Sequence, residues 1–425
     1  MAEGFIIAAP STGSGKTLVT LALLRALKRM GVSVASCKAG PDYIDPRFHE
    51  AASGAPCLNL DSWAMRPVLW KSLLARQARE AELVIIEGVM GLFDGSTGGQ
   101  GSTAELARAT NLPIVLVVDA ARQGQSIAAL IHGFKTFRPD VRVAGVILNR
   151  VASARHADLL TENLQGENLI GWLPRMDELK LPERHLGLVQ ASEIASLEAY
   201  LEKAADVVLE HLDFSKLPGA ATPRYGTMPG LAPLGQTIAI ARDEAFGFLY
   251  SHIAESWRQQ GAQITFFSPL NNEAVPEAAA VFLPGGYPEL HAGKLATAAT
   301  FRASLRKAAE RALIYGECGG FMVLGRDLID ADGRHHAMAG LLPHTTSFAA
   351  RKLALGYRMV SHTSPLGWPR HLRGHEFHYS TQTTPHEADP LFRVKGIQGE
   401  DLGVAGLKRN RVMGSYIHII DQEPT

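Results

Sequence analysis

The sequence predicts two α/β domains joined by a linker, the first of them a doubly wound parallel β-sheet. Two observations carry this prediction. Short apolar runs alternate with segments of helical spacing in residues 1–216 and again in residues 236–425, a pattern typical of strands alternating with helices. Between the two series, residues 217–235 are rich in Pro and Gly and show no periodicity, which indicates a linker.

In the first domain, the helix at Lys16–Met30 is predicted from Leu18, Leu21, Leu24 and Leu27, which recur at helical spacing. The strands are predicted from continuous apolar runs, as expected for parallel strands buried on both faces. These runs are Phe5–Ala9, Val32–Cys37, Leu83–Ile86, Ile114–Val118 and Val143–Leu148.

The second domain shows the same alternation. Its predicted helices are Ala245–Gln259 and Thr297–Ala312. Its predicted strands are Thr237–Ala241, Ile264–Phe267, Ala280–Leu283 and Leu313–Tyr315.

The composition excludes several classes of protein. A length of 425 residues is enough for two or three domains, each with its own core. Lys and Arg number 42, as do Asp and Glu, and this zero net charge argues against a nucleic-acid partner. No apolar run reaches the ~18 residues of a membrane span, and we expect no secretory leader. With only 3 cysteines we expect a reducing compartment, the cytoplasm, and we interpret Cys37 and Cys57 as apolar fillers.

A phosphate-binding loop is predicted where the first strand meets the first helix. Residues 10–17 read PSTGSGKT, in the strand–loop–helix context that a P-loop requires. Its glycines let backbone N–H groups surround phosphate oxygens, Lys16 neutralises the β- and γ-phosphates, and Thr17 is a ligand for Mg²⁺. The alternative, a Gly/Ser turn capping a helix, leaves the Lys-Thr pair unexplained, although Pro10 replaces the first glycine of the motif. We therefore expect ATP and Mg²⁺ at Ser11, Thr12, Gly13, Ser14, Gly15, Lys16 and Thr17.

Acidic residues follow three strands of the same domain. KAGPDYID (38–45) comes after the second strand, EGVMGLFD (87–94) follows Ile86, and Asp119 ends a further apolar run. The carboxyl ends of parallel strands line the ligand crevice of an open sheet. These acidic residues are therefore candidates for Mg²⁺ or for substrate positioning; for any one of them, helix capping is the alternative.

A cysteine nucleophile is predicted in the second domain. The last predicted strand leads into GECGG (316–320), the cysteine form of a nucleophile elbow. Small flanking residues allow a strained turn, and the following helix N-terminus is expected to lower the pKa of the Cys318 thiol. His418, in GSYIH, is the candidate base, and the turn at Gly285 and Gly286 is the candidate oxyanion hole. The alternatives are an ordinary buried thiol and a core histidine. Neither CxxC nor HExxH occurs, so we expect no zinc site.

Six motifs follow the phosphate loop in order: KAGPDYID, EGVMGLFDG, PGGYPE, GECGG, RGHEFHYS and GSYIH. From Phe5 to His418, this combination resembles the cobyrinic and hydrogenobyrinic acid a,c-diamide synthase family. The resemblance implies an ATP-dependent synthetase domain similar to dethiobiotin synthetase, followed by a class I glutamine amidotransferase domain. It also implies amidation of the a and c carboxylates of a corrinoid in cobalamin biosynthesis, with ammonia from L-glutamine and an acyl-phosphate intermediate.

The resemblance implies roles for single residues. Cys318 and His418 match the catalytic pair, and Asn149, in GVILNR, lies where the related synthetase reads the adenine. The implied metal ligands are Thr17, Asp45 and Glu87. Substrate handling is implied for Lys38, Asp42, Tyr43, Asp45 and Asp94.

One departure and several alternatives remain. Class I amidotransferases carry His-x-Glu, but position 420 is Ile, so Asp421 or a group elsewhere must orient the imidazole. Other readings are cobyric acid synthase, nickel-sirohydrochlorin a,c-diamide synthase, or a P-loop ATPase with a regulatory domain. The sequence does not choose between a cobalt-bearing and a metal-free corrin. It does not give the oligomeric state, so a homodimer stays open.

Overall fold

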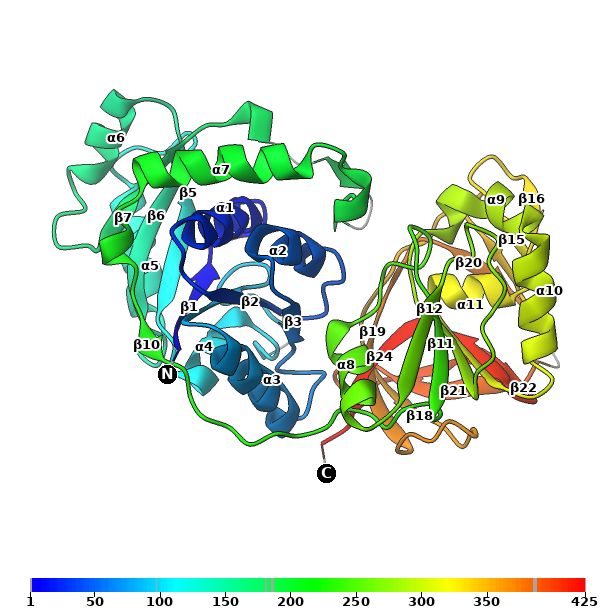
Figure 1. Cartoon of the computed structure of the whole chain (residues 1–425). Coiled ribbons are helices and arrows are strands. Elements are labelled where there is room, and N and C mark those ends of the chain that lie inside the picture. Colours follow the sequence, from blue (N-terminus) through cyan, green and yellow to red (C-terminus); the bar gives the residue numbers. More distant parts are fainter. Residues whose placement is uncertain (1, 97, 180–181, 185–186, 385–387, 425) are drawn as a thin grey trace. The chain divides into compact units, whose positions relative to one another are not determined.

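The computed structural model describes residues 2–96, 98–179, 182–184, 187–384 and 388–424. Its contacts divide the chain into two compact units. Unit 1 comprises Met1–Trp63 and Pro67–Met228, and unit 2 comprises Ala64–Arg66 and Pro229–Thr425. Each unit has its own β-sheet (Figure 1).

Unit 1 is a doubly wound α/β fold. In its described part the sheet order is β3-β2-β4-β1-β5-β6-β7, all parallel, and β10 pairs antiparallel with β1. Helices α1, α2 and α7 pack together over one face, and α3 and α4 lie on the other (Figure 1). The strands are β1 Glu3–Ala8, β2 Val34–Ala39, β3 Cys57–Leu60, β4 Leu83–Glu87, β5 Ile114–Asp119, β6 Val143–Val151, β7 Leu169–Pro174, β8 Glu183–Arg184, β9 Gly187–Leu188 and β10 Ala220–Ala221. The helices are α1 Lys16–Arg29, α2 Asp45–Ser53, α3 Pro67–Glu80, α4 Thr103–Thr110, α5 Ile127–Thr136, α6 Ala154–Thr161 and α7 Leu197–His211.

The winding of unit 1 places the phosphate loop at a switch point of the sheet. From β1 the chain crosses over α1 to β2, whereas from β4 it crosses over α4 to β5 on the far side of β1. Because β1 and β4 are neighbours, the loops after them open away from each other and leave a crevice at their carboxyl ends. The phosphate loop, which follows β1, and Glu87, the last residue of β4, therefore lie close together at the carboxyl ends of these two strands.

Part of the segment expected as a linker belongs to the sheet of unit 1. Residues Ala220–Ala221 pair with Glu3 and Gly4, and the Thr222 side chain donates to the Ala2 carbonyl oxygen. The Pro and Gly content of residues 217–235 hid this short strand, which only two residues form.

Unit 2 carries a mixed sheet. In the part of unit 2 that the structure describes, the order is β12-β11-β13-β14-β23-β22-β21-β18-β19-β24; the first five strands are parallel and the later pairs antiparallel. A small second sheet has the order β16-β15-β17-β20. The strands are β11 Thr237–Ala241, β12 Gln263–Phe267, β13 Ala280–Leu283, β14 Leu313–Glu317, β15 Asp327–Ile329, β16 His335–Ala337, β17 Thr345–Ser347, β18 Ala354–Ser361, β19 His371–His378, β20 Thr381–Thr383, β21 Pro390–Lys395, β22 Asp401–Arg409, β23 Val412–Ser415 and β24 Ile417–Gln422. The helices are α8 Ser251–Gln259, α9 Ala292–Thr297, α10 Ala299–Ala308 and α11 Gly319–Leu324.

Two helices of unit 2 are shorter than predicted. The helix predicted from Ala245 begins at Ser251, because the preceding segment is held in a bridge in which the Phe248 N–H donates to the Gly285 carbonyl oxygen at 2.9 Å. The helix predicted from Thr297 begins at Ala299, because Ala298 has a ψ of 73° and breaks the run. In the described residues no helix is long and apolar enough to cross a membrane.

Candidate active sites

The phosphate loop of unit 1 has a backbone that only glycine fits. Gly13 and Gly15 have φ values of 81° and 96°, in the left-handed region. A Cβ on Gly15 would lie 2.1 Å from Nδ2 of Asn149, which donates to the Ser14 carbonyl oxygen at 2.9 Å. The residues Ser11, Thr12 and Gly13 are exposed, as a phosphate-binding surface requires.

Asn149 has a different place from the one expected. Its side chain is buried beneath the loop, with Nδ2 on Ser14 and Oδ1 accepting from the Arg150 N–H at 3.0 Å. Both ends of this buried amide are engaged, and its bond to Ser14 supports the loop; contact with the adenine stays a prediction. The β6 register that brings it there, opposite Asp119, was not visible from the sequence.

Lys16 lies in the crevice with its ammonium group directed at a backbone oxygen. Its Nζ donates to the Met90 carbonyl oxygen at 2.5 Å, and the side chain is buried. Burial and the neighbouring Lys38 lower the pKa of Lys16. A bound phosphate oxygen would offset both effects on the pKa of Lys16, because its negative charge stabilises the protonated ammonium group that burial deprives of water.

A buried ionic cluster adjoins the loop. Strand register sets Lys38 of β2 directly beside Glu87 of β4, and Lys38 Nζ lies 2.7 Å from Glu87 Oε1 and 2.7 Å from Asp45 Oδ2. The Thr17 hydroxyl donates to Glu87 Oε1 at 2.7 Å and lies 3.4 Å from Asp45 Oδ2. The predicted metal and substrate residues Thr17, Lys38, Asp45 and Glu87 are thus brought together.

The charges of this cluster shift one another. Burial acts to lower the pKa of Lys38, but Asp45 and Glu87 raise it overall, so the ammonium stays charged. Burial and the nearby Asp42 raise the pKa of Asp45. Burial opposes ionisation of Glu87 as well, yet Lys38 and His49 hold the pKa of this carboxyl well below its usual range.

His49 is a functional residue that sequence reasoning missed. Its Nε2 lies 2.7 Å from Glu87 Oε2, and its Nδ1 lies 3.5 Å from the sulfur of Cys57. Cys57, interpreted as an apolar filler, therefore also contacts the side chain that orients Glu87. The signal was available, because His49 is four residues after Asp45 and so shares its face of α2.

The donor set here suits Mg²⁺. Two carboxylates and a hydroxyl converge next to a phosphate loop, and hard oxygen donors are what this ion takes while it keeps waters and phosphate oxygens as further ligands. Among the residues that the structure describes, no group of three or more His, Cys, Asp and Glu side chains could hold a metal ion. An open, partial site is what a nucleotide-bound Mg²⁺ needs.

The remaining predicted residues of unit 1 mainly shape loops. Asp42 Oδ1 accepts from the N–H groups of Ile44 and Asp45 at 2.8 and 2.9 Å, which starts α2. Asp94 Oδ2 accepts from the Gly91 N–H at 2.9 Å and so closes the loop after β4. Tyr43 is half-buried beside Asp42. Asp119 pairs with Arg150 at 2.6 Å.

In unit 2, Cys318 occupies a strained elbow between β14 and α11. Its φ of 46° and ψ of −107° are rare for a residue with a side chain, and the strain is typical of a nucleophile elbow. Close packing leaves no room for a side chain at Gly316 or Gly320, the glycines on either side of Cys318. A Cβ on Gly316 would lie 2.7 Å from Leu324, and one on Gly320 would lie 1.9 Å from the Leu283 carbonyl oxygen.

The structure brings the elbow, the histidine and the glycine turn together. A Cβ on Gly285 would lie 2.4 Å from Cε1 and 3.0 Å from Nε2 of His418, and 3.1 Å from Cβ of Cys318. The turn from β13 therefore packs directly against both side chains, although Cys318 and His418 are 100 residues apart in sequence. Only the absence of a side chain at Gly285 leaves room for the imidazole.

Gly319 is a further candidate for the oxyanion hole, in addition to the predicted glycine turn. A Cβ on Gly319 would lie 3.0 Å from the backbone N of Gly286, so the N–H of the turn lies beside the residue after the nucleophile. In elbow enzymes that following residue supplies one oxyanion N–H. Gly286 and Gly319 are thus the pair of donors that the geometry favours.

The expected lowering of the Cys318 pKa is wrong. Burial raises the pKa of the thiol, with Glu289 adding to the effect, and the Gly319 N–H lowers it only in part. Helix α11 has just 6 residues, so its dipole is weak against this desolvation. Burial also lowers the pKa of His418 to about 3, aided by His375 and His378. The pair rests as a neutral thiol and a neutral imidazole.

The first six residues of the motif RGHEFHYS lie in β19, which pairs with the strand of His418. His375 pairs with His418 across β19 and β24. Glu376 is held by Arg358 at 2.8 Å and by His378 at 3.1 Å. The carboxylate of Glu376 also raises the pKa of Cys318, which places it in the electrostatic environment of the thiol.

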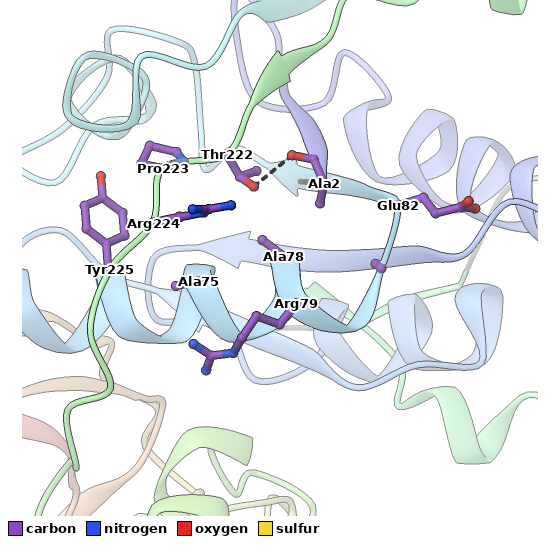
Figure 2. Close-up of a pocket in the computed structure, with 10 residues that line it drawn as sticks. Ala2, Ala75, Ala78, Arg79, Glu82, Thr222, Pro223, Arg224 and Tyr225 are labelled. Carbon is purple, nitrogen blue, oxygen red and sulfur yellow. Dashed lines mark hydrogen bonds between the residues drawn. The ribbon is translucent and has the colours of Figure 1, made fainter.

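Unit 1 also has a pocket of about 710 Å³, whose lining residues are shown in Figure 2. It is lined by residues at the amino ends of β1 and β4 and by the chain that follows β10, with Arg79, Arg224 and Tyr225 at its walls. Ligands of doubly wound sheets bind at the carboxyl ends of the strands. Among its lining residues that the structure describes, none is a predicted site residue.

Two family matches divide the chain. Residues 5–189 match the CobQ/CobB/MinD/ParA nucleotide binding domain, and residues 237–424 match the CobB/CobQ-like glutamine amidotransferase domain. A solved structure of chloroplast FtsY from Physcomitrella patens is 15% identical, covers 48% of this chain and 65% of its own, and has a TM-score of 0.32, too low to carry an argument.

Curated relatives match over the full length. The hydrogenobyrinate a,c-diamide synthase of Brucella abortus is 55% identical over 429 residues, which cover 99% of this chain and 98% of the relative. The protein of the same name from Rhizobium meliloti is 54% identical over 428 residues, 99% of each chain. That from Sinorhizobium sp is 52% identical over 429 residues, again 99% of each.

Proposed function

The chain belongs to the hydrogenobyrinate a,c-diamide synthase family, and we propose that it amidates the a and c carboxylates of hydrogenobyrinic acid with ammonia released from glutamine. The protein is an amidoligase with a nucleotide-binding domain and a glutamine amidotransferase domain. The observation that carries the proposal is the pairing of two complete constellations: the loop with its Thr17–Asp45–Glu87 cluster, and the Cys318–His418–Gly285 elbow. The metal-free corrin is chosen because the full-length relatives carry that substrate in their names.

The synthetase half activates the carboxylate. A carboxylate is a poor electrophile, because its leaving group would be hydroxide. An oxygen of the corrinoid carboxylate attacks the γ-phosphorus of ATP, the bond to the β-phosphate oxygen breaks, and ADP leaves an acyl phosphate. The loop Ser11–Thr17 binds the phosphates, and Lys16 offsets the charge on the transferred group. Ammonia then adds to the acyl carbon, phosphate departs, and one proton is lost to give the amide.

Thr17, Asp45 and Glu87 would hold Mg²⁺ here, and the ion, when bound, offsets the negative charge of the β- and γ-phosphates. His49 keeps Glu87 ionised and oriented from the far side of the carboxylate. Lys38, buried between Asp45 and Glu87, neutralises part of their negative charge and so lowers the repulsion that a polycarboxylate substrate would meet near this cluster.

The amidotransferase half releases ammonia. His418 takes the Cys318 thiol proton as the sulfur attacks the glutamine amide carbon, and the N–H groups of Gly286 and Gly319 bind the oxyanion. The proton passes from His418 to the leaving nitrogen, so ammonia departs and a thioester remains. Water, deprotonated by His418, then attacks the thioester and releases glutamate.

The substrate is tested by product mass. We expect hydrogenobyrinic acid, ATP, Mg²⁺ and glutamine to give a product that has exchanged two hydroxyl groups for two amino groups. Mass spectrometry with cobyrinic acid in parallel separates the metal-free from the cobalt-bearing substrate. Amidation of neither corrin would contradict the proposal, and a product with other sites amidated would indicate a different synthetase of this build.

We predict that single substitutions can abolish one of the two half-reactions and leave the other intact. Cys318→Ala removes the nucleophile, so glutamine-dependent synthesis should fall by about 10³-fold or more while synthesis from high ammonium persists. Lys16→Ala should abolish synthesis from either nitrogen source while Cys318 still reacts with an electrophilic glutamine analogue. Equal loss of both nitrogen sources in Cys318→Ala would contradict a two-site enzyme.

A further inference from the structure

The group that orients His418 is not where class I amidotransferases place it. Position 420, two residues after the histidine, is Ile. The next acidic residue, Asp421, is fully buried and forms an ion pair with Arg66. Its Oδ2 accepts from the N–H and Nε of Arg66 at 2.9 and 2.8 Å, and its Oδ1 accepts from Nη2 at 3.0 Å. Asp421 therefore neutralises a guanidinium and is not available to the imidazole.

Another carboxylate reaches His418 from β14, a strand that does not pair with β24. Glu317 is the last residue of β14 and immediately precedes Cys318. Its Oε2 lies 3.9 Å from Nδ1 of His418, and its Oε1 accepts from the backbone N–H of Ile419 at 3.0 Å. The bond to Ile419 anchors the side chain beside the histidine, and both side chains are almost fully buried.

The imidazole presents its two nitrogens to different partners. A Cβ on Gly285 would lie 3.0 Å from Nε2 of His418 and 3.1 Å from Cβ of Cys318, so Nε2 and the nucleophile border the same small space. The other nitrogen, Nδ1, is on the side of Glu317. This is the order of a nucleophile–base–carboxylate relay.

We propose that Glu317 is the positioning residue of the amidotransferase site: its carboxylate holds the Nδ1–H of His418, in place of the missing His-x-Glu glutamate. The proposal rests on the glutamine hydrolysis proposed above. The carboxylate fixes the tautomer with Nε2 unprotonated, so that Nε2 takes the thiol proton. It then stabilises the imidazolium until that proton moves to the departing ammonia. The 3.9 Å separation shortens when the site charges, as apo catalytic contacts do.

The decisive variant is Glu317→Gln. Its carbonyl oxygen still accepts from Ile419, but its amide N–H₂ faces Nδ1 and favours the tautomer with Nε2 protonated, which cannot accept the thiol proton. We expect kcat for glutamine hydrolysis to fall by about 10²- to 10⁴-fold with KM for glutamine unchanged. Ammonium-dependent synthesis should stay at the wild-type rate, which also reports that the variant folds.

Asp421→Asn is the matched control. It removes a carboxylate from the same strand as His418 but breaks only the clamp to Arg66, so we expect a lower melting temperature and an unchanged kcat for glutamine hydrolysis. A second variant, Glu317→Asp, keeps the charge with a shorter reach and should retain at least tenfold more kcat than Glu317→Gln.

The pH profile gives an independent readout. The titratable groups that face Glu317 are His418 on β24 and Tyr315 and Cys318 at its own strand and elbow. Burial raises the pKa of Glu317 to about 8. Wild-type kcat for glutamine hydrolysis should therefore rise as the pH passes about 8, and Glu317→Gln should lack this rise.

The outcomes are separable. Glu317→Gln with kcat within a few-fold of wild type, or Glu317→Asp no better than Glu317→Gln, would overturn the role of Glu317. A large loss of kcat in Asp421→Asn alone would assign the role to Asp421 instead. Wild-type protein that releases no glutamate from glutamine would instead overturn the proposed function.

Discussion

At the scale of single residues, the predicted nucleophile and base lie together, but their supporting residues came only from the structure. Cys318 and His418 carry recognisable neighbours in sequence, whereas the contact between Glu317 and His418 crosses from β14 to β24. Spacing along the chain does not report such a contact. The pKa of Cys318 was predicted in the wrong direction because a motif shows the helix that follows the thiol and not its burial.

His344 provides a prediction of pH-dependent stability. It is fully buried, stacks on Phe321 at 4.0 Å between ring centroids and contacts the Phe321 carbonyl oxygen at 3.1 Å. Burial lowers the pKa of His344 from 6.5 to about 3. Between these values the unfolded chain binds a proton that the folded chain does not, so the contribution is present above pH 6.5 and is lost as the pH falls. At pH 5 the loss is about 2 kcal/mol.

The measurement compares wild type with His344→Gln in urea at pH 8 and pH 5. The variant keeps a side chain able to reach the Phe321 carbonyl but does not titrate, so its unfolding free energy should fall less on acidification. His335→Gln is the control, because His335 is exposed and its loss should leave the pH dependence unchanged. An identical acid-induced loss in wild type and His344→Gln would refute the assignment.

At the scale of elements, buried parallel strands were predicted well and antiparallel ones were not. The strands Thr237–Ala241 and Ala280–Leu283 have the predicted bounds, because continuous apolar runs identify strands covered on both faces. No strand was predicted between residues 325 and 410. Strands there are partly exposed: most residues of β18 are half-buried, and β22 is mostly exposed and contains two glycines and three charged residues, so the apolar signal is weak.

Gly320 tests how tightly the elbow is packed against β13. Its Cβ would lie 1.9 Å from the Leu283 carbonyl oxygen and 2.5 Å from the carbonyl carbon, so Gly320→Ala must displace backbone. We expect a loss of about 3 kcal/mol in the stability of unit 2 and loss of glutamine hydrolysis. Urea unfolding of the full chain measures it.

Gly293→Ala is the matched control for that substitution. Gly293 is in α9, and the nearest atom to an added Cβ is 3.9 Å away, so alanine should be neutral or stabilise the helix by up to about 1 kcal/mol. Equal tolerance of both substitutions would show that the elbow can relax.

At the scale of the whole molecule, the predicted α/β fold class is confirmed for both halves, and so is the predicted family. The sequence separates two chemistries because each has its own motif set. Residues Ala64–Arg66 belong to unit 2, although the residues on both sides of them belong to unit 1. A segment of three residues is too short to give a periodic signal in the sequence. Its place in unit 2 reflects the ion pair between Arg66 and the buried Asp421.

Two compact units with separate sheets should respond to different ligands. We expect two calorimetric transitions in the full chain. A non-hydrolysable ATP analogue with Mg²⁺ at 100 times its Kd should stabilise the unit 1 transition by about 2.7 kcal/mol, and Lys16→Ala should abolish that shift. An electrophilic glutamine analogue bound to Cys318 should raise the temperature of the unit 2 transition, and Cys318→Ala should abolish that increase.

Each variant serves as the control for the other ligand, because it removes one site and leaves the second intact. A single transition that either ligand moves would mean that the two units unfold as one cooperative body.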